Sequence, residues 1–375
     1  MTCEAQQRIN KCIQNNEVEL DLSFLRLDEL PKNLPAWLQK LYCGNNYLKV
    51  LPNNLPTSLQ ELNCDNNNLT CLPDNLPTSL RELHCRVNHI SVIPDNLPAS
   101  LRKLNFAYNQ VTRLPDNLPA SLQELHFVHN QVTLLPNSLP ASLQKLNCNG
   151  NQITRLPDNL PASLQELDCG NNKLNVIPDT LPDSLQILDC TANKLTRLPD
   201  KLPASLSHLW CNGNNITCLP ALPALLRSLN CNDNKLTALP DNFPASLLNL
   251  YCCDNQIRAL PANFPASCET LYCLNNYLTS LPDNLPVLYN FHCEDNYYLY
   301  VTKSQALKYN LRETPNCNEI IRIVQKRWRL KRRILRLRFC KNLKDHAEQF
   351  LLRPGNYLYH VLCDQNKGVF ADLVY

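Results

Sequence analysis

Glycine is scarce in this sequence: 6 glycines stand against 28 prolines among 375 residues. Glycine usually supplies the positive φ of tight turns, whereas proline holds φ near −65°, so the turns are predicted to depend on proline. Long apolar runs are lacking as well. No stretch approaches the roughly 18 unbroken apolar residues of a membrane span. The opening MTCEAQQRINKCIQNNEVEL also lacks the apolar core of a secretory signal.

The lack of a secretory signal affects how the 20 cysteines of the chain are interpreted. In a short secreted protein so many cysteines would indicate disulfide bonds. Without a secretory signal we expect an intracellular, reducing location (the cytoplasm, or the cytoplasm of a host) and reduced thiols. Hydrophobic residues make up 44 % of the sequence, which is enough for a continuous core and excludes a disordered chain.

Charge is unevenly distributed behind a net value of +3. Between Arg322 and Lys341 there are ten Lys or Arg residues and no acidic residue. Removing these ten leaves 26 basic against 33 acidic residues, a balance of about −7. The chain therefore consists of two parts of different character.

An asparagine recurs every 21 residues along most of the chain, with one residue fewer before the tenth and before the last. Thirteen units carry it, at Asn46, Asn67, Asn88, Asn109, Asn130, Asn151, Asn172, Asn193, Asn214, Asn234, Asn255, Asn276 and Asn296. Each unit reads close to L-x-x-L-x-C-x-x-N-x-L-T-x-L-P-D-N-L-P-A-S. A degenerate unit with Leu20, Leu22, Leu27 and Leu30 precedes them.

The pattern of one unit predicts a short strand, a sharp turn and an extended return. Around Leu146 apolar and polar residues alternate, as in a half-buried strand, and such a short strand buries its apolar face only by stacking on its neighbours. The amide of Asn151 is expected to pair backbone groups that the turn would leave buried and unpaired. Pro157 and Pro161 are incompatible with a regular helix in the return.

This pattern resembles the leucine-rich repeat, L-x-x-L-x-L-x-x-N/C-x-L. The short 20–21-residue form is similar to the repeats of secreted bacterial effector proteins, and to repeat proteins encoded by giant amoebal viruses. The resemblance implies a horseshoe-shaped solenoid with a parallel concave β-sheet and an extended, non-helical convex side. We expect a cap helix in residues 1–16, the solenoid in 17–300 and an α+β C-terminal cap or tail in 301–375.

The third apolar position of the unit holds cysteine in eleven of the thirteen repeats, at Cys43, Cys64, Cys85, Cys148, Cys169, Cys190, Cys211, Cys231, Cys252, Cys273 and Cys293. Phe106 and Phe127 occupy it in the other two, so the position requires an apolar side chain and we predict buried thiols. A zinc site needs four converging ligands, and we expect neither a metal nor another cofactor. Cys253 falls on a strand position expected to face solvent, which makes it the predicted accessible thiol.

One catalytic hypothesis follows from the resemblance to effectors. Some bacterial effectors with similar repeats carry a C-terminal ubiquitin-ligase domain with a Cys-x-Asp active site, and Cys293-Glu294-Asp295 has those letters. However, Cys293 is also the core cysteine of the last repeat, and the 79 residues after Asn296 are too few for that helical domain. We therefore expect no enzyme and no catalytic residue, and keep an effector or adaptor linked to ubiquitin ligation as the alternative.

The strand residue between the second and third apolar positions is free of core requirements, yet it is often aromatic or histidine. We predict a partner-binding concave face at Tyr42, His84, His126, Trp210, Tyr251, Tyr272 and His292. Trp210, Tyr251 and Tyr272 are the best contact anchors, because aromatic side chains offer a large rigid area at little entropic cost. The alternative is that these rings cover the sheet by packing on each other across strands.

The basic segment of the tail is expected to form an apolar and basic helix. Its central charges are Arg327, Arg329, Lys331, Arg332 and Arg333. Three interpretations compete: a cap over the last repeat with Trp328 buried, a calmodulin-type or anionic-membrane site, and a nucleic-acid site. We favour the cap, because the edge at Asn296 has to be covered.

Together these patterns predict a non-catalytic, monomeric scaffold for protein–protein interaction. The partner is expected to be a protein bound on the concave face, with no small-molecule substrate. Nucleic acid or membrane is expected as a partner only through the basic tail.

Overall fold

Fourteen three-residue strands form one parallel sheet in the computed structural model, which describes residues 3–296 and 299–309. The strands are β1 Glu19–Asp21, β2 Lys40–Tyr42, β3 Glu61–Asn63, β4 Glu82–His84, β5 Lys103–Asn105, β6 Glu124–His126, β7 Lys145–Asn147, β8 Glu166–Asp168, β9 Ile187–Asp189, β10 His208–Trp210, β11 Ser228–Asn230, β12 Asn249–Tyr251, β13 Thr270–Tyr272 and β14 Asn290–His292. They follow one another in chain order, so each repeat contacts only its neighbours. The predicted thirteen repeats and the degenerate first unit, which supplies β1, are confirmed.

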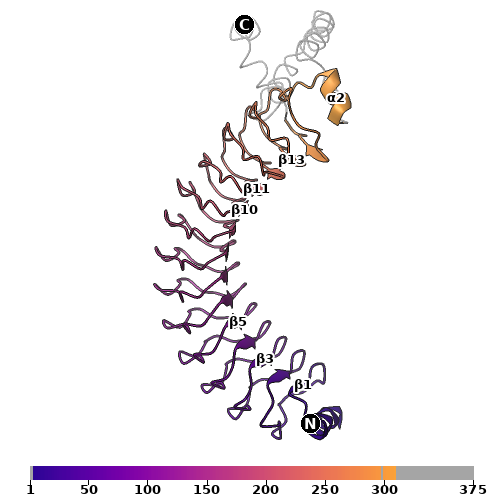
Figure 1. Ribbon diagram of the computed structural model, residues 1–375, viewed down its shortest axis with the longest axis vertical. Helices are drawn as coiled ribbons and strands as arrows, with labels where there is room; N and C mark the ends of the chain where they lie inside the picture. The colour runs from indigo at the N-terminus through magenta and orange to yellow at the C-terminus, as the bar shows by residue number, and fades with distance from the viewer. Residues whose placement is uncertain (1–2, 297–298, 310–375) are drawn as a thin grey trace, which may run out of the picture.

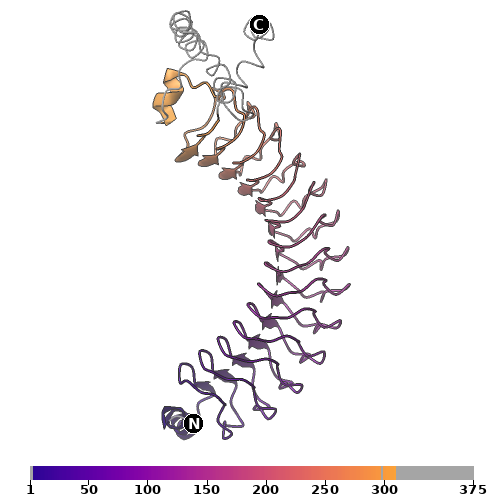
Figure 2. The ribbon, with the colours of Figure 1, turned by 180° about the vertical axis from the view of Figure 1, so that it is seen from behind.

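The sheet lines the inner side of a curved solenoid, and the return paths form its outer side (Figures 1 and 2). The central leucine of a typical strand is fully buried, as Leu167 is, while its two neighbours are half-buried on the inner side. Neighbouring strands pair in register, so that Leu146 lies opposite Leu167. Between residues 19 and 296 the convex side contains no helix, as the spacing of the prolines predicted.

The core is a stack of equivalent layers. Each layer contains the leucines of the strand and of the return path together with the cysteine or phenylalanine of the third apolar position. Phe106 and Phe127 stack in adjacent layers with ring centroids 5.6 Å apart. A single strand of three residues has no core of its own, so each layer is stable only between its neighbours.

The repeated asparagine joins the layers. Asn151 is 8 % exposed, and its Nδ2 donates to the carbonyls of Cys148 at 3.0 Å, Asn149 at 3.2 Å and Phe127 at 3.0 Å. Its Oδ1 accepts the backbone N–H of Val132 at 3.0 Å. Two of these four bonds reach the preceding repeat. The amide therefore pairs buried backbone groups on both sides of a repeat boundary, as predicted.

A second polar ladder, formed by serine hydroxyls, runs along the start of the strands. The Oγ of Ser142 lies 2.8 Å from the carbonyl oxygen of Ala120 and 2.6 Å from that of Leu122, both in the preceding repeat. Nine further serines bond at least one carbonyl of the preceding repeat: Ser58, Ser79, Ser100, Ser121, Ser163, Ser184, Ser205, Ser246 and Ser267. The sequence pattern contained these serines, but their role was not predicted.

The turn after each strand contains no proline, so the expectation that proline determines the turns is wrong for this turn. The residue before every ladder asparagine has positive φ, and in two repeats this residue is glycine, Gly150 at 68° and Gly213 at 67°. Asn and Asp fill most of the other positions, since their short polar side chains tolerate the left-handed region. Val87, Tyr108, His129 and Ala192 fill the remaining four positions, and Val87, at φ 53°, is strained there because it is β-branched. Proline shapes only the return path, where for instance the N–H of Leu143 bonds the carbonyl of Pro140.

A helix closes the N-terminal end of the core. Helix α1, Cys3–Gln14, buries Ala5, Ile9 and Cys12 against the first repeat, and Arg8 Nη1 donates to the carbonyl of Asp21 in β1 at 3.0 Å. The expected N-terminal cap helix is therefore confirmed.

At the other end, residues 299–309 cover the last repeat. Leu299, Val301 and Ala306 are buried in the core, and helix α2, Lys303–Tyr309, places the ring of Tyr309 5.3 Å from that of Phe291 in β14. The expected basic helix and the rest of the tail lie outside the described residues. Within the described part of the chain, no helix has the length and apolar character to cross a membrane.

The asparagine ladder predicts a measurable loss of stability. Asn151→Ala should lower the free energy of unfolding by about 1–3 kcal/mol, because it leaves buried backbone groups unpaired. Urea titration followed by circular dichroism measures the change. Gln131→Ala, at an exposed position next to the ladder, is the control and should shift stability by no more than about 0.5 kcal/mol. Equal stability of the two variants would contradict a structural role for Asn151.

Candidate partner-binding face

All seven predicted contact residues lie on the concave side as the third residue of their strands. Each is half-buried, and the group comprises Tyr42, His84, His126, Trp210, Tyr251, Tyr272 and His292. Tyr251, Tyr272 and His292 come together because their strands are adjacent and in register. His84 and His126 are separated by Asn105, which occupies the equivalent position in the strand between them. The structure thus forms one aromatic cluster and leaves the N-terminal members apart.

The aromatic cluster consists of edge-to-face contacts between neighbouring strands. Tyr251 and Tyr272 have ring centroids 5.3 Å apart at 74°, and Tyr272 and His292 have centroids 4.6 Å apart at 70°. Trp210 packs against His208 of its own strand at 5.9 Å. Tyr251, Tyr272 and His292 therefore pack on each other across strands, as the alternative interpretation expected, and remain partly exposed on the concave side.

The N-terminal half of the face is charged and largely self-neutralised. The first residue of each strand forms a row in which Lys40 pairs with Glu61 at 3.1 Å and Lys145 with Glu166 at 2.8 Å. Lys103 lies between Glu82 at 3.6 Å and Glu124 at 3.9 Å. These partly exposed pairs add little stability, but they leave no unpaired cation in this row for a partner.

The proton affinity of His126, on the concave side, depends on its burial and on a neighbouring carboxylate. Burial lowers the pKa of His126, and this effect outweighs the nearby carboxylate of Glu124, 3.7 Å away, which acts to raise it. The imidazole is therefore neutral at neutral pH, so it presents hydrogen-bonding nitrogens rather than a charge.

The ladder cysteines are core residues with unreactive thiols. Cys43 is fully buried, its Sγ lies 3.3 Å from the carbonyl of Asn63, and burial raises its pKa to about 12. A nucleophilic cysteine requires the opposite shift. Cys293 is likewise buried, and its pKa is raised to about 12 by burial and by Glu294. The cysteine of the Cys-x-Asp sequence, Cys293, is therefore a protonated thiol in the core.

The prediction that Cys253 is the accessible thiol is wrong. Cys253 is only 7 % exposed, and its N–H bonds Asn232 Oδ1 at 2.7 Å. The residue follows the end of β12, so the inside–outside alternation of a strand no longer applies to it. Among the cysteines between Cys12 and Cys293, Cys71 and Cys218 are the exposed ones, and both are free thiols. Residues 3–296 and 299–309 contain no group of three His, Cys, Asp or Glu side chains arranged to hold a metal ion.

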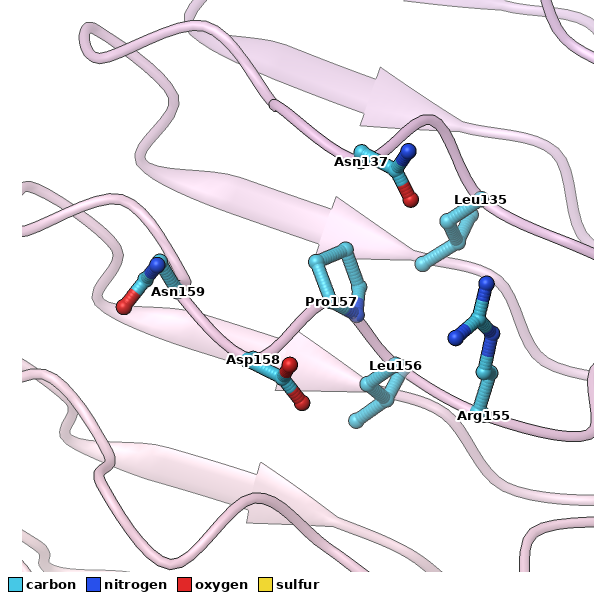
Figure 3. A pocket seen from close by; sticks show the side chains of 7 residues that line it. All are labelled: Leu135, Asn137, Arg155, Leu156, Pro157, Asp158 and Asn159. Atoms are coloured by element: carbon cyan, nitrogen blue, oxygen red, sulfur yellow. The ribbon is translucent and has the colours of Figure 1, made fainter.

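A hollow of about 250 Å³ lies on the return side, lined by Leu135, Asn137, Arg155, Leu156, Pro157, Asp158 and Asn159 (Figure 3). The arginines at the equivalent position two repeats away on either side pair with an aspartate, Arg113 with Asp95 and Arg197 with Asp179. Asn137 replaces that aspartate beside Arg155. The hollow is open and shallow, with an exposed arginine at its rim, and it offers no enclosed site for a small molecule.

Comparison with known proteins identifies the family. The Leucine Rich Repeat family profile matches residues 163–183. YopM from Yersinia pestis, whose structure is described as that of a leucine-rich effector protein, is 30 % identical, with 78 % of this chain and 92 % of that chain covered and a TM-score of 0.62. This chain belongs to the leucine-rich-repeat family.

Two further structures support the same relationship. YopM from Yersinia enterocolitica WA-314 is 34 % identical over 79 % of this leucine-rich-repeat chain, which spans 66 % of the length of that protein, with a TM-score of 0.71. InlJ from Listeria monocytogenes, described as including a cysteine ladder, shares the fold at 24 % identity and a TM-score of 0.66, with 72 % of this chain and 61 % of that chain covered. No curated protein matches by sequence. The predicted resemblance to bacterial-effector repeats is confirmed.

The burial of the thiols predicts a selective labelling pattern. In the native protein at pH 8, iodoacetamide should alkylate Cys71 and Cys218 and leave the ladder thiols, such as Cys169, unmodified until the chain is unfolded in urea. Peptide mass spectrometry measures the modification of each cysteine. In the double variant with Cys71→Ser and Cys218→Ser, alkylation of the two peptides that contain these positions should be lost in the native state. Alkylation of all other peptides should stay the same. Alkylation of Cys169 at the rate of Cys71 would contradict a buried ladder.

The raised pKa values of the ladder thiols also predict a pH dependence of stability. The unfolded chain releases thiol protons above about pH 8.5, whereas burial keeps the folded ladder protonated. Because the unfolded state then binds fewer protons than the native state, the free energy of unfolding should fall as the pH rises from 8 to 10. Urea titrations at several pH values measure this slope. Cys169→Val with Cys190→Val should make the slope shallower, and an unchanged slope would contradict the prediction.

Proposed function

We propose that this leucine-rich-repeat protein is a non-catalytic scaffold that binds a protein partner on its concave face. The observation that carries the proposal is the aromatic group Trp210, Tyr251 and Tyr272. These rings occupy strand positions that do not contribute to the core, and they remain partly exposed. Tyrosine and tryptophan are enriched among the residues that dominate binding energy at interfaces.

The cross-strand packing of the rings supports this role. A ring already held by a neighbour, as Tyr272 is held between Tyr251 and His292, loses little conformational freedom when a partner covers it. Such preorganisation raises affinity because less entropy is lost on binding. Packing on each other and contacting a partner are therefore compatible functions of these side chains.

A non-catalytic scaffold agrees with the state of the cysteine in the Cys-x-Asp sequence. Cys293 is a buried core thiol whose pKa is raised, and nucleophilic catalysis needs an exposed, readily ionised one. The similarity to the Yersinia effector proteins supports a related proposal, that the scaffold acts as an effector-type adaptor inside a cell. We further propose that it works as a monomer and that its thiols are reduced in an intracellular location.

The proposal is tested by removing two anchors from the full-length chain. Trp210→Ala with Tyr251→Ala should weaken capture of a protein partner by at least about 30-fold, which corresponds to one hot-spot residue of about 2 kcal/mol. The melting temperature should change little. Capture from the cytosol of the source organism or of its host, quantified by mass spectrometry, measures the loss.

The control replaces two tyrosines that are exposed beyond the turn, Tyr47→Ala with Tyr277→Ala. Both follow a ladder asparagine, where the chain has left the concave sheet. The control variant should retain capture. A partner that binds both variants equally well would place the interaction on another surface and overturn the proposal.

A further inference from the structure

The concave face changes its charge along the solenoid. Strands β1–β9 each contain at least one Lys, Glu or Asp, whereas β10–β14 contain none. In these last five strands the outward positions hold aromatic, imidazole, amide and hydroxyl groups, including Trp210, Tyr251, Tyr272 and His292. We call the inner side of β10–β14 the neutral aromatic face.

An acidic border runs along one side of this face. The two turn positions between the core cysteine and the ladder asparagine hold Asp233, Asp254, Glu294 and Asp295 in the repeats of β11, β12 and β14, and no acidic residue in the repeat of β13. All four carboxylates are exposed, and neither Lys nor Arg occurs at these positions. Asp254 accepts a bond from Asn275 at 2.7 Å, and Glu294 lies 3.4 Å from His292 Nδ1. Among the described residues none of the four forms an ion pair with Lys or Arg, so these carboxylates are not neutralised.

The neutral aromatic face and its acidic border together favour a ligand that is both cationic and apolar. Aromatic faces attract guanidinium and ammonium groups, and carboxylates without a Lys or Arg partner attract the same groups. The uncharged strand positions between them accept apolar side chains without leaving a charge unpaired. The neutral aromatic face and its acidic border therefore suit a segment that is both arginine-rich and apolar.

We propose that residues 320–341 of this same chain are that segment and occupy the neutral aromatic face. Their sequence, IIRIVQKRWRLKRRILRLRFCK, contains ten Lys or Arg and no acidic residue, interspersed with isoleucine, leucine, valine and Trp328. The charge is opposite to that of the border. The apolar and aromatic content matches the exposed rings of β10–β14.

The length of the connection allows this placement. Tyr309 is fixed at the end of the solenoid, because its hydroxyl donates to the carbonyl of Leu285 at 2.9 Å and its ring packs on Phe291 in β14. The ten residues 310–319 extend to at most roughly 35 Å. Five parallel strands at about 4.8 Å spacing span only about 20–24 Å, so the whole face is within reach of the tethered segment.

Residues that precede the segment pack over the end of the core. Leu299, Val301 and Ala306 already bury that end, and Gln305 Nε2 bonds the carbonyl of Leu281 at 3.1 Å. Tethering raises the local concentration of residues 320–341 to the order of millimolar, so modest contacts fill the face. An external partner would then have to displace the chain's own segment. The inference shares a surface with the proposed function but does not depend on the existence of that partner.

The test places a photo-crosslinker in the segment of the full-length protein. p-Benzoylphenylalanine replaces Trp328, the monomeric fraction is irradiated, and mass spectrometry maps the linked peptides. We expect links to residues 228–295, which carry β11–β14 and the acidic border. Asp233→Asn, Asp254→Asn and Asp295→Asn together should reduce the yield several-fold, as should 0.5 M salt, because both weaken charge attraction. The same probe at Leu335 serves if the Trp328 variant does not fold.

A matched control makes the same change of charge elsewhere. Asp74→Asn, Asp116→Asn and Asp158→Asn remove three exposed carboxylates from the return side and should leave the yield unchanged. Links confined to residues 299–309 would overturn the proposal in favour of a cap. An absence of links to the solenoid would overturn it in favour of a segment that binds another ligand. Neither result bears on partner capture, which tests the proposed function separately.

Discussion

The pairing of buried backbone groups by one side-chain amide is the constraint on which the rest of the structure depends. Each ladder asparagine is bonded to its own repeat and to the preceding one, as Asn151 is to Cys148 and to Phe127. A turn sharp enough to close a repeat in 21 residues leaves carbonyls and N–H groups in the core, and burying them unpaired would cost about 1–3 kcal/mol each. The spacing of successive repeats follows from this network.

The serine ladder and the layered core also join successive repeats, and neither restricts which side chains occupy the inner surface. The serine ladder bonds successive repeats at the start of the strands, where Ser142 reaches Ala120 and Leu122. Leucine and cysteine fill the layers between them. Because none of these contacts involves the outward side chains of the strands, those positions tolerate different chemistry from repeat to repeat. The outward positions accordingly form charged pairs in β2–β8 and carry uncharged and aromatic side chains in β10–β14.

The division of the face gives its two halves different surface chemistry. Where Lys145 already pairs with Glu166, a partner gains little from a new charge, since it must compete with an existing pair. At the C-terminal half the rings of Tyr251 and Tyr272 are ordered by contact with each other, and no strand charge has to be desolvated. Binding energy is therefore expected to concentrate on the last five strands.

The sequence by itself determined the repeat length, the short strands, the extended return, the buried thiols and the bonding role of Asn151, because each is a local pattern repeated many times. It also located the seven concave residues, which follow from the alternation of a strand. Only the tertiary structure decided that Tyr251, Tyr272 and His292 touch, that Cys253 is buried and that Ser142 bonds the preceding repeat. These contacts join residues about 20 positions apart, and the shortened repeat before Asn296 keeps Tyr272 opposite His292. They depend on the register between stacked repeats, which is set by packing and backbone pairing across the whole solenoid rather than within any one unit.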